Sequence, residues 1–326
     1  CKSLKAPFPY FGGKSRVAAA VWARFGDPKN YVEPFFGSGA ILLARPTPPR
    51  IETVNDLDCY LANFWRAIQA DPEQVAAWAD TPVNEAELYS RHQWLVAQGA
   101  WLRAVMQNDP DYYHCKMAGW WAWGLSCWIG AGWCSIKDIQ DSRFKNQDQG
   151  KGTHKKSTYR HKQAARIARK IPMLSSGGQG VNARCVQNGI YRRSPPIYEW
   201  FLELALRLRR VRVCCGDWRR VLTPTVTYRH GLTAVFLDPP YSDKAGRKKN
   251  LYTEDSHEVA HQARAWALAN GDNPKLRIAL CGYAGEHAMP KSWRQYKWTA
   301  RGGYGNRSGN QNRKKERIWY SPHCIK

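Results

Sequence analysis

A buried strand that runs straight into two prolines constrains the fold of this chain more than any other feature. Residues 234–237, Ala-Val-Phe-Leu, are followed by Asp238-Pro239-Pro240-Tyr241. Each proline fixes its own φ angle and keeps the residue before it out of the helical region, so the chain leaves the strand in a stiff, extended loop. We therefore expect a rigid corner at the end of a buried strand.

The chemistry of this corner suits a planar base that carries an NH2 group. The Asp238 carboxylate and the Pro239 carbonyl can both accept hydrogen bonds from one such group, while the Tyr241 ring offers a face for stacking. If Tyr241 acts by stacking, its ring matters more than its hydroxyl. The corner predicts methyl transfer to an exocyclic amine. A plain turn after a strand would explain the Asp and the prolines, but not the Tyr.

The N-terminal part of the chain has the pattern of a nucleotide-binding α/β unit. Residues 31–39, Tyr-Val-Glu-Pro-Phe-Phe-Gly-Ser-Gly, read as a strand that ends in a glycine turn before a helix. Gly37 and Gly39 let the backbone approach a ligand closely. Leu42 stands where the third glycine of the dinucleotide fingerprint would fall, so a pyrophosphate need not bind here.

A second apolar strand, residues 51–54, ends at Asn55-Asp56. A carboxylate in this place can hydrogen-bond both hydroxyls of a ribose, which makes Asp56 a ribose-binding candidate. The alternative is that Asp56 caps the helix expected over 57–69, a position that Asp58 could fill equally well.

The segment 8–15, Phe-Pro-Tyr-Phe-Gly-Gly-Lys-Ser, ends like a phosphate-binding loop. Its spacing does not fit that motif, because position 8 is Phe where a glycine is required. The segment does combine the aromatic ring of Tyr10, two glycines and the cation of Lys14. Such a set can cover a ligand and pair with its carboxylate.

The formal net charge of +24 and the pI near 9.8 indicate a polyanionic partner, most simply nucleic acid. No stretch approaches the roughly 18 uninterrupted apolar residues of a membrane helix, and no basic-then-apolar leader opens the chain. We therefore expect a soluble protein that is not exported and has no membrane partner.

Much of the positive charge falls in the middle of the chain. Residues 137–193 contain 14 Lys or Arg and 3 Asp, without a sustained apolar run. This composition predicts a nucleic-acid contact surface, and a disordered basic tether is the alternative. The tryptophan-rich stretch 120–133 precedes it, and we expect those rings to build a core rather than a platform for bases. The candidate phosphate contacts are Lys151, Lys155, Lys156, Arg160, Lys162, Arg166 and Arg169.

The ten cysteines do not have the pattern of a disulfide scaffold, so reduced thiols are expected. His114, Cys115, Cys127 and Cys134 form a loose cluster, but it lacks a Cys-x2-Cys pair. We therefore predict no metal site.

Taken in order, the motifs resemble those of Dam-like DNA adenine-N6 methyltransferases of the α group. The resemblance covers residues 8–70 and about 195–326, and the tryptophan-rich middle is similar to that of phage-type members. It implies S-adenosyl-L-methionine as the methyl donor. The matching segments are Pro9–Lys14, Glu33–Gly39, Asn55-Asp56 and Asp238–Tyr241.

The resemblance also implies roles for single residues. Asp238 is expected to face both the cofactor and the target amine, and Asp56 to bind the ribose. Position 10 is Tyr where Trp is common in the family, and residues 215–218 only loosely resemble its adenine pocket. The implied cofactor-binding residues are Tyr10, Lys14, Glu33, Phe35, Gly37, Gly39, Asp56, Asp217 and Asp238. The implied catalytic residues are Asp238, Pro239 and Tyr241.

The predicted fold is α/β, a Rossmann-like methyltransferase sheet with an inserted region that is mainly helical and basic. Residues 1–70 and 195–326 are expected to form the catalytic domain, and 71–194 the DNA-target-recognition domain. The pattern predicts a helix over 197–210, strands over 211–215, 235–237 and 276–281, and an antiparallel hairpin from 296–299 and 317–321.

The resemblance implies site-specific methylation of adenine N6 in double-stranded DNA after base flipping. The setting is then the cytoplasm of a bacterial or phage-infected cell, on the nucleoid, with no obligate protein partner. Two alternatives stay open: a cytosine-N4 methyltransferase, although those more often have Ser in place of Asp238, and an inactive basic DNA-binding protein.

Overall fold

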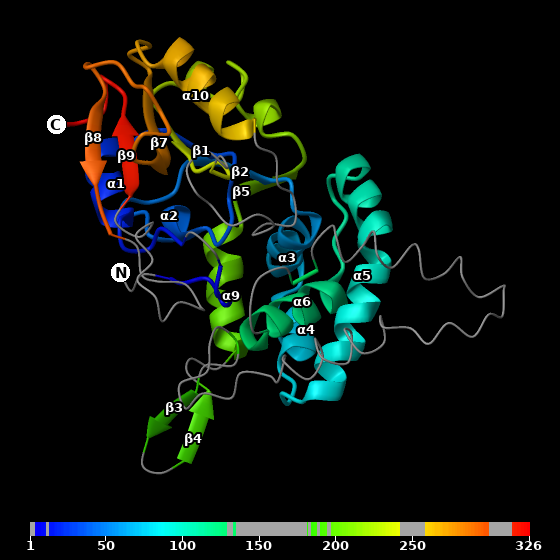
Figure 1. Cartoon of the computed structure of the whole chain (residues 1–326). Coiled ribbons are helices and arrows are strands. Elements are labelled where there is room, and N and C mark those ends of the chain that lie inside the picture. Colours follow the sequence, from blue (N-terminus) through cyan, green and yellow to red (C-terminus); the bar gives the residue numbers. More distant parts are fainter. Residues whose placement is uncertain are drawn as a thin grey trace, which may run out of the picture.

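The computed structural model describes residues 4–10, 13–128, 133–134, 181, 184–187, 190–193, 197–241, 258–299 and 315–326. Within these residues, seven strands form one sheet and two more form a separate hairpin (Figure 1). The sheet strands are β1 (Asn30–Glu33), β2 (Ile51–Asp56), β5 (Val211–Cys215), β6 (Thr233–Leu237), β7 (Leu276–Tyr283), β8 (Arg294–Lys297) and β9 (Glu316–Tyr320). The hairpin consists of β3 (Arg184–Gln187) and β4 (Ile190–Arg193).

The strands follow the order β5-β2-β1-β6-β7-β9-β8 across the sheet. Neighbours from β5 to β7 are parallel, whereas β9 runs antiparallel to both β7 and β8. The predicted α/β fold with a Rossmann-like sheet is therefore confirmed, including the antiparallel hairpin at one edge.

The helices of the described residues are α1 (Ala18–Phe25), α2 (Ala40–Leu43), α3 (Cys59–Ala70), α4 (Pro72–Ala79), α5 (Glu85–Asn108), α6 (Cys115–Cys127), α9 (Ile197–Leu208) and α10 (Val259–Asn270). None of the described helices combines the length and the apolar character that crossing a bilayer requires.

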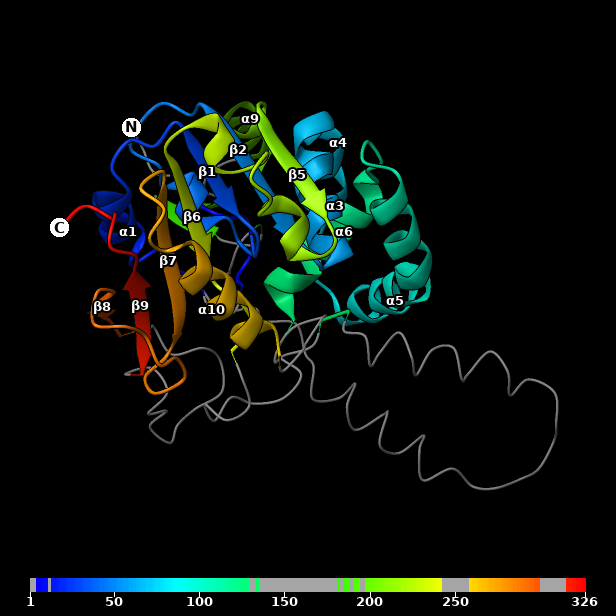
Figure 2. The ribbon, with the colours of Figure 1, turned by 90° about the horizontal axis from the view of Figure 1, so that it is seen from above.

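Both faces of the sheet are buried, because side chains alternate between the faces along each strand. Tyr31 and Phe236 point into one hydrophobic core, together with α1, α3 and α9, whereas Val32 and Val235 point into the opposite core under α10. Figure 2 shows α10 on one side of the sheet and α9 on the other. The uninterrupted burial of β1 and β6 follows from this double coverage.

The helices α4, α5 and α6 extend the first core beyond the sheet, where α4 and α6 pack against α3 and α9 (Figure 1). Trp121 and Trp123 of α6 are fully buried. Two glycines permit this packing: a Cβ at Gly119 would lie 2.4 Å from a Trp78 side-chain atom, and one at Gly124 would lie 2.0 Å from the Trp133 ring. The prediction that the tryptophans build a core is confirmed for these rings.

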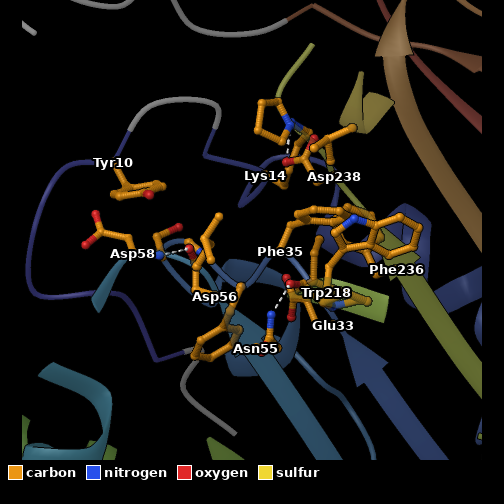
Figure 3. Close-up of a pocket in the computed structure, with 18 of the residues that line it drawn as sticks. Tyr10, Lys14, Glu33, Phe35, Asn55, Asp56, Asp58, Trp218, Phe236 and Asp238 are labelled. Carbon is orange, nitrogen blue, oxygen red and sulfur yellow. Dashed lines mark hydrogen bonds and ion pairs between the residues drawn. The ribbon is translucent and has the colours of Figure 1, made fainter. Parts of the chain in front are cut away.

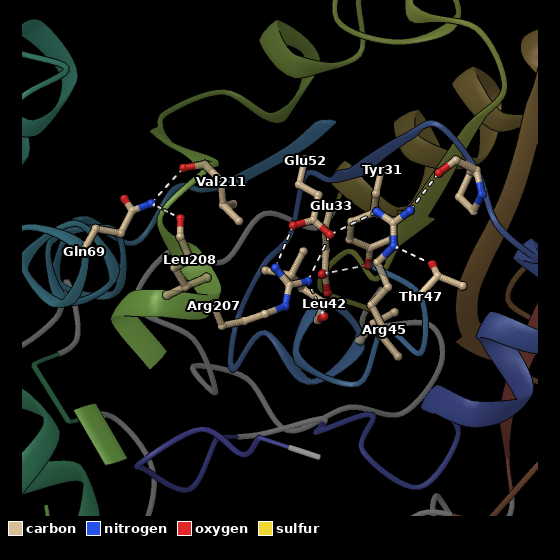
Figure 4. A network of polar contacts seen from close by, with 12 residues as sticks. Tyr31, Glu33, Leu42, Arg45, Thr47, Glu52, Gln69, Arg207, Leu208 and Val211 are labelled. Atoms are coloured by element: carbon tan, nitrogen blue, oxygen red, sulfur yellow. Dashed lines mark hydrogen bonds and ion pairs between the residues drawn. The ribbon is translucent and has the colours of Figure 1, made fainter. Parts of the chain in front are cut away.

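A buried ion cluster fixes the amino-terminal end of β2 (Figure 4). The Glu52 side chain is 1% exposed, and its carboxylate accepts from Arg45 at 3.1 Å and from Arg207 of α9 at 2.7 Å. A buried carboxylate is tolerated only when cations and hydrogen bonds compensate it, and two arginines do so here. The cluster therefore holds α9 and the segment after α2 against the end of β2 that lies opposite Asp56.

Candidate functional site

A cavity of about 350 Å³ lies at the carboxyl ends of β1, β2, β5 and β6. The chain passes from β1 to β2 on one side, while β6 lies on the other side of β1 and leads to β7. The loops after β1 and β6 therefore diverge, and open α/β sheets bind ligands at such switch points. Eight residues predicted from the sequence line the cavity: Tyr10, Lys14, Glu33, Phe35, Gly37, Asp56, Asp217 and Asp238. Figure 3 labels all of these except Gly37 and Asp217.

The glycine turn after β1 brings backbone close to the cavity. Gly37 has a φ of +49° and Gly39 a φ of +64°, a region that residues with a side chain rarely adopt. A Cβ at Gly37 would lie 3.0 Å from the Tyr10 ring, and one at Gly39 would lie 2.7 Å from the Phe36 ring. Gly37 thus gives room to Tyr10 above the cavity, whereas Gly39 lies behind the lining and lets the turn pack on Phe36.

Asp56 ends β2 on the wall of the cavity, and Asp58 caps the next helix. One Asp56 oxygen accepts from the Gly37 N–H at 3.0 Å and the other from the Asp58 N–H at 3.0 Å. The Asp58 carboxylate accepts from the first N–H groups of α3, so the capping position belongs to Asp58. Burial raises the pKa of Asp56 to about 7, and the Gly37 N–H offsets only part of this effect.

Asn55 joins the loops that follow β1 and β5. Its Nδ2 donates to the Pro34 carbonyl at 3.1 Å and to the Gly216 carbonyl at 3.0 Å. Its Oδ1 is buried and has no hydrogen-bond partner among the residues that the structure describes. A buried acceptor without a donor is costly, so a ligand N–H or O–H would be stabilising there. The sequence pattern drew attention to Asn55 only as the neighbour of Asp56.

Aromatic rings form a further wall of the cavity. The ring centroids of Phe35 and Trp218 are 5.6 Å apart at an interplanar angle of 34° (Figure 3). Beside them, the Asp217 carboxylate pairs with the Arg219 guanidinium at 2.7 Å, and the Arg219 hydrogen bond lowers the pKa of Asp217. This wall combines apolar faces with one exposed carboxylate, which suits a planar, partly polar ligand.

Two carboxyl groups stand side by side where β1 and β6 end. Asp238 begins the proline corner and lies 2.7 Å from the Lys14 ammonium group, and Pro240 also lines the cavity. Glu33 is buried and accepts from the Tyr31 hydroxyl at 2.8 Å. Burial raises the pKa of Glu33 well above its usual range, and Asp238 adds to this effect.

Tyr241 lies behind Asp238 rather than on the cavity lining. Tyr241 is 8% exposed, and its ring packs edge to face against the Tyr283 ring, with the two ring centroids 4.6 Å apart. Its hydroxyl accepts from the Lys14 ammonium at 3.1 Å and donates to the Glu316 carboxylate at 2.8 Å. Pro239 is buried as well. No contact of the Tyr241 ring tests the predicted stacking of a base, which stays a prediction. The Tyr241 hydroxyl, in contrast, is bound to Lys14 and Glu316.

Sequence reasoning missed Glu316. It opens β9, is 6% exposed, and reaches the proline corner only because β9 pairs with β7. Burial raises its pKa, Lys14 lowers it and Asp238 raises it further. One feature of the sequence could have drawn attention to Glu316: it is a lone acidic residue directly before the apolar strand expected over 317–321. We expected that strand only to close the sheet.

Two further predictions concern phosphate contacts and metal binding. The basic residues Lys151, Lys155, Lys156, Arg160, Lys162, Arg166 and Arg169 lie outside the described residues. Among the described residues, no group of three or more His, Cys, Asp or Glu is arranged to hold a metal ion.

Comparison with known proteins identifies one family. A family model described as D12 class N6 adenine-specific DNA methyltransferase matches residues 10–275. The matched range contains every residue that lines the cavity and ends before β9. It favours adenine N6 over the cytosine-N4 alternative. No curated protein matches the chain.

Proposed function

The chain belongs to the D12 class of N6 adenine-specific DNA methyltransferases, and from this premise we propose which of its residues carry the reaction. Members of this class methylate adenine N6 in DNA and use S-adenosyl-L-methionine as the methyl donor. The proposal concerns the residues that hold the donor, those that hold the adenine, and those that contact the rest of the DNA.

The cavity has the chemistry that S-adenosylmethionine needs. Its volume of about 350 Å³ is within the range of small-molecule sites, and the unpartnered Asn55 Oδ1 offers an acceptor beside it. The Lys14 cation would hold the donor's carboxylate, Asp56 its ribose hydroxyls, and the Phe35 and Trp218 rings its purine. The remaining proposed contacts are Tyr10, Glu33, Gly37, Asp217 and Asp238, and Gly39 is proposed to act through the shape of the turn that carries Gly37.

When bound, S-adenosylmethionine supplies an electrophilic methyl group, and the electron pair of its carbon–sulfur bond stays with sulfur as N6 bonds to the carbon. The amine of adenine is a weak nucleophile, because its lone pair is delocalised into the ring. Asp238 and the Pro239 carbonyl accept its two hydrogens and so favour a tetrahedral nitrogen, an effect that is greatest in the transition state. Asp238 thus orients the amine.

The target adenine is proposed to leave a double-stranded substrate by base flipping, since an amine inside the duplex cannot reach a closed pocket. The Tyr241 ring then supports the flipped base. Residues 71–194 form the target-recognition part in this proposal, and the seven basic residues from Lys151 to Arg169 neutralise phosphates. Binding to chromosomal DNA places the enzyme in the cytoplasm on the nucleoid, and the tryptophan-rich middle supports a phage-type member.

One observation carries the proposal: Asp238 stands at the switch point of the sheet, on the same cavity as Asp56 and Asn55. Asp238→Ala is expected to lower methylation by about a hundredfold or more while sparing DNA binding. Mass analysis of nucleosides from DNA treated with either protein measures N6-methyladenine directly. A variant that keeps more than a few per cent of wild-type methylation would refute the assignment of Asp238.

A further inference from the structure

We propose that Glu316 is the final acceptor of the proton that leaves adenine N6, and that the Tyr241 hydroxyl passes this proton on from Asp238. The inference rests on the proposed placement of the adenine amine at Asp238. It concerns a residue outside the range matched by the family model, which ends at 275.

The reaction requires an acceptor for one proton. Formation of the N6–carbon bond leaves the nitrogen with a positive charge and two hydrogens, and the neutral product retains one of them. Asp238 is the nearest carboxylate in the proposed arrangement. One of its oxygens is paired with the Lys14 ammonium at 2.7 Å, however, and this ion pair is lost while Asp238 carries the proton. The proton therefore needs a further resting place.

The hydrogen bonds beyond Asp238 provide one route. The second Asp238 oxygen lies 3.2 Å from the Tyr241 hydroxyl, and that hydroxyl lies 2.8 Å from a Glu316 oxygen. A hydroxyl has one hydrogen to donate and two lone pairs to accept with. Protonated Asp238 can donate to the Tyr241 oxygen while the Tyr241 hydrogen moves to Glu316. Asp238 ends ionised, Tyr241 ends neutral, and Glu316 ends with the proton.

The surroundings of Glu316 suit an acceptor. It is 6% exposed, and burial raises the pKa of its carboxyl, so it holds a proton better than a solvated glutamate. The charged groups that face Glu316 shift its pKa in opposite directions. The charge of Lys14 lowers the pKa of Glu316, whereas those of Asp238 and Glu286 raise it. The Cys281 thiol is buried in the same cluster, and burial raises its pKa well above the usual value.

The route is also reversible. The Asp238 side chain is 19% exposed and lines the cavity, whereas Glu316 does not. Once the product has left, the proton can return through Tyr241 to Asp238 and from there to water. Glu316 thus needs no separate path to solvent.

The decisive variant is Glu316→Gln, which keeps the size of the side chain and its acceptor oxygen but cannot take a proton. Single-turnover methylation by the wild type, measured with S-adenosylmethionine saturating at every pH so that Asp56 does not limit binding, is expected to fall at low pH, as Glu316 becomes protonated beforehand. The variant should show a plateau rate about tenfold lower or more, without this acid limb. Glu286→Gln is the matched control, because Glu286 lies in the same cluster and accepts from the Tyr283 N–H instead. It should keep both plateau and limb.

Two further measurements separate a proton relay from a structural role. Infrared spectra of the cofactor-free protein, recorded across a pH titration, should contain a protonated-carboxyl band that Glu316→Gln lacks. Tyr241→Phe should lower the rate as much as Glu316→Gln, and the double variant should be no slower than either one, since both changes interrupt one route. If Tyr241 acted by stacking alone, the Phe variant would be mild.

Equal rates for Glu316→Gln and the wild type across the pH range would overturn the relay, as would effects of the two changes that multiply in the double variant. Calorimetry with S-adenosylmethionine and thermal unfolding identify any variant that fails to fold, and the infrared titration of the wild type then still decides. Loss of methylation in Asp238→Ala with normal rates in Glu316→Gln would leave the proposed function intact and reject only the relay.

Discussion

The Lys14 ammonium group, from the segment before the first strand, lies 2.7 Å from the carboxylate of Asp238 at the end of β6. Burial lowers the pKa of Lys14, but the electrostatic interactions with Asp238, Cys281 and Glu316 outweigh this and raise it above its usual value. Lys14 is therefore a permanent cation at the proline corner. It balances the carboxylates of Asp238 and Glu316.

Lys14→Met removes this cation and keeps an unbranched side chain. We expect the affinity for S-adenosylmethionine to fall by about tenfold or more, as for the loss of one charge-assisted hydrogen bond. Calorimetry would measure it. 5′-Methylthioadenosine, which lacks the amino-acid part, should bind the variant and the wild type equally. An equal loss for both ligands would show that Lys14 does not contact the carboxylate.

Asp56 should make cofactor binding depend on pH. Its pKa is raised to about 7, and only the ionised carboxylate accepts hydrogen bonds from both ribose hydroxyls with full strength. Affinity for S-adenosylmethionine should therefore rise by up to about tenfold between pH 6 and pH 8. Asp56→Asn should bind more weakly without this rise, whereas Lys14→Met should keep it. The same pH dependence in Asp56→Asn would assign it to another group.

The stability of the cofactor-free protein should also depend on Asp56. Its pKa in the folded state, about 7, is above the value of about 3.9 in an unfolded chain. The stabilisation from the protonated form is complete below the unfolded value and is lost as the pH rises through about 7. The unfolding midpoint in thermal scans should fall from pH 5 to pH 8, and it should fall less in Asp56→Asn. A steeper fall in the variant would contradict this sign.

Asp58 should contribute stability through its cap. Its carboxylate accepts from the Tyr60 N–H at 2.9 Å, so Asp58→Ala leaves an N–H at the start of α3 unpaired. The free energy of unfolding in urea should fall by about 1 kcal/mol. Asp71→Ala, which removes the cap of α4, provides a matched comparison at a helix away from the cavity. No loss in Asp58→Ala would mean that another group satisfies this N–H.

The basic segment can be tested by the dependence of DNA affinity on salt. Replacement of Lys155 and Lys156 by Ala should reduce the slope of log affinity against log salt by about two, if both lysines neutralise phosphates. The affinity should fall alike for all DNA sequences, because phosphate contacts carry no sequence information. The control removes the same charge from the exposed Lys275 and Lys291. An equal change in slope in the control would indicate an effect of net charge alone.

The sequence predicted most of what a local pattern determines. The strand before Asp238 could be identified because an apolar run followed by two prolines leaves few conformations. The choice between Asp56 and Asp58 as the helix cap could not be made, because both follow the same strand and only the hydrogen bonds to Tyr60 and Gly37 distinguish them. Glu316 and Tyr241 are 75 positions apart in the sequence and come close only because β9 pairs with β7, which no local pattern records.

The place of β9 in the sheet has a consequence for synthesis of the protein. β9 pairs with β7 and β8 although it follows both in the chain, and it carries Glu316 into the cluster at Tyr241. On the ribosome, the proline corner emerges well before the partner of its tyrosine. The proline corner is therefore synthesised before Glu316, so the proposed relay is complete only once β9 has been translated.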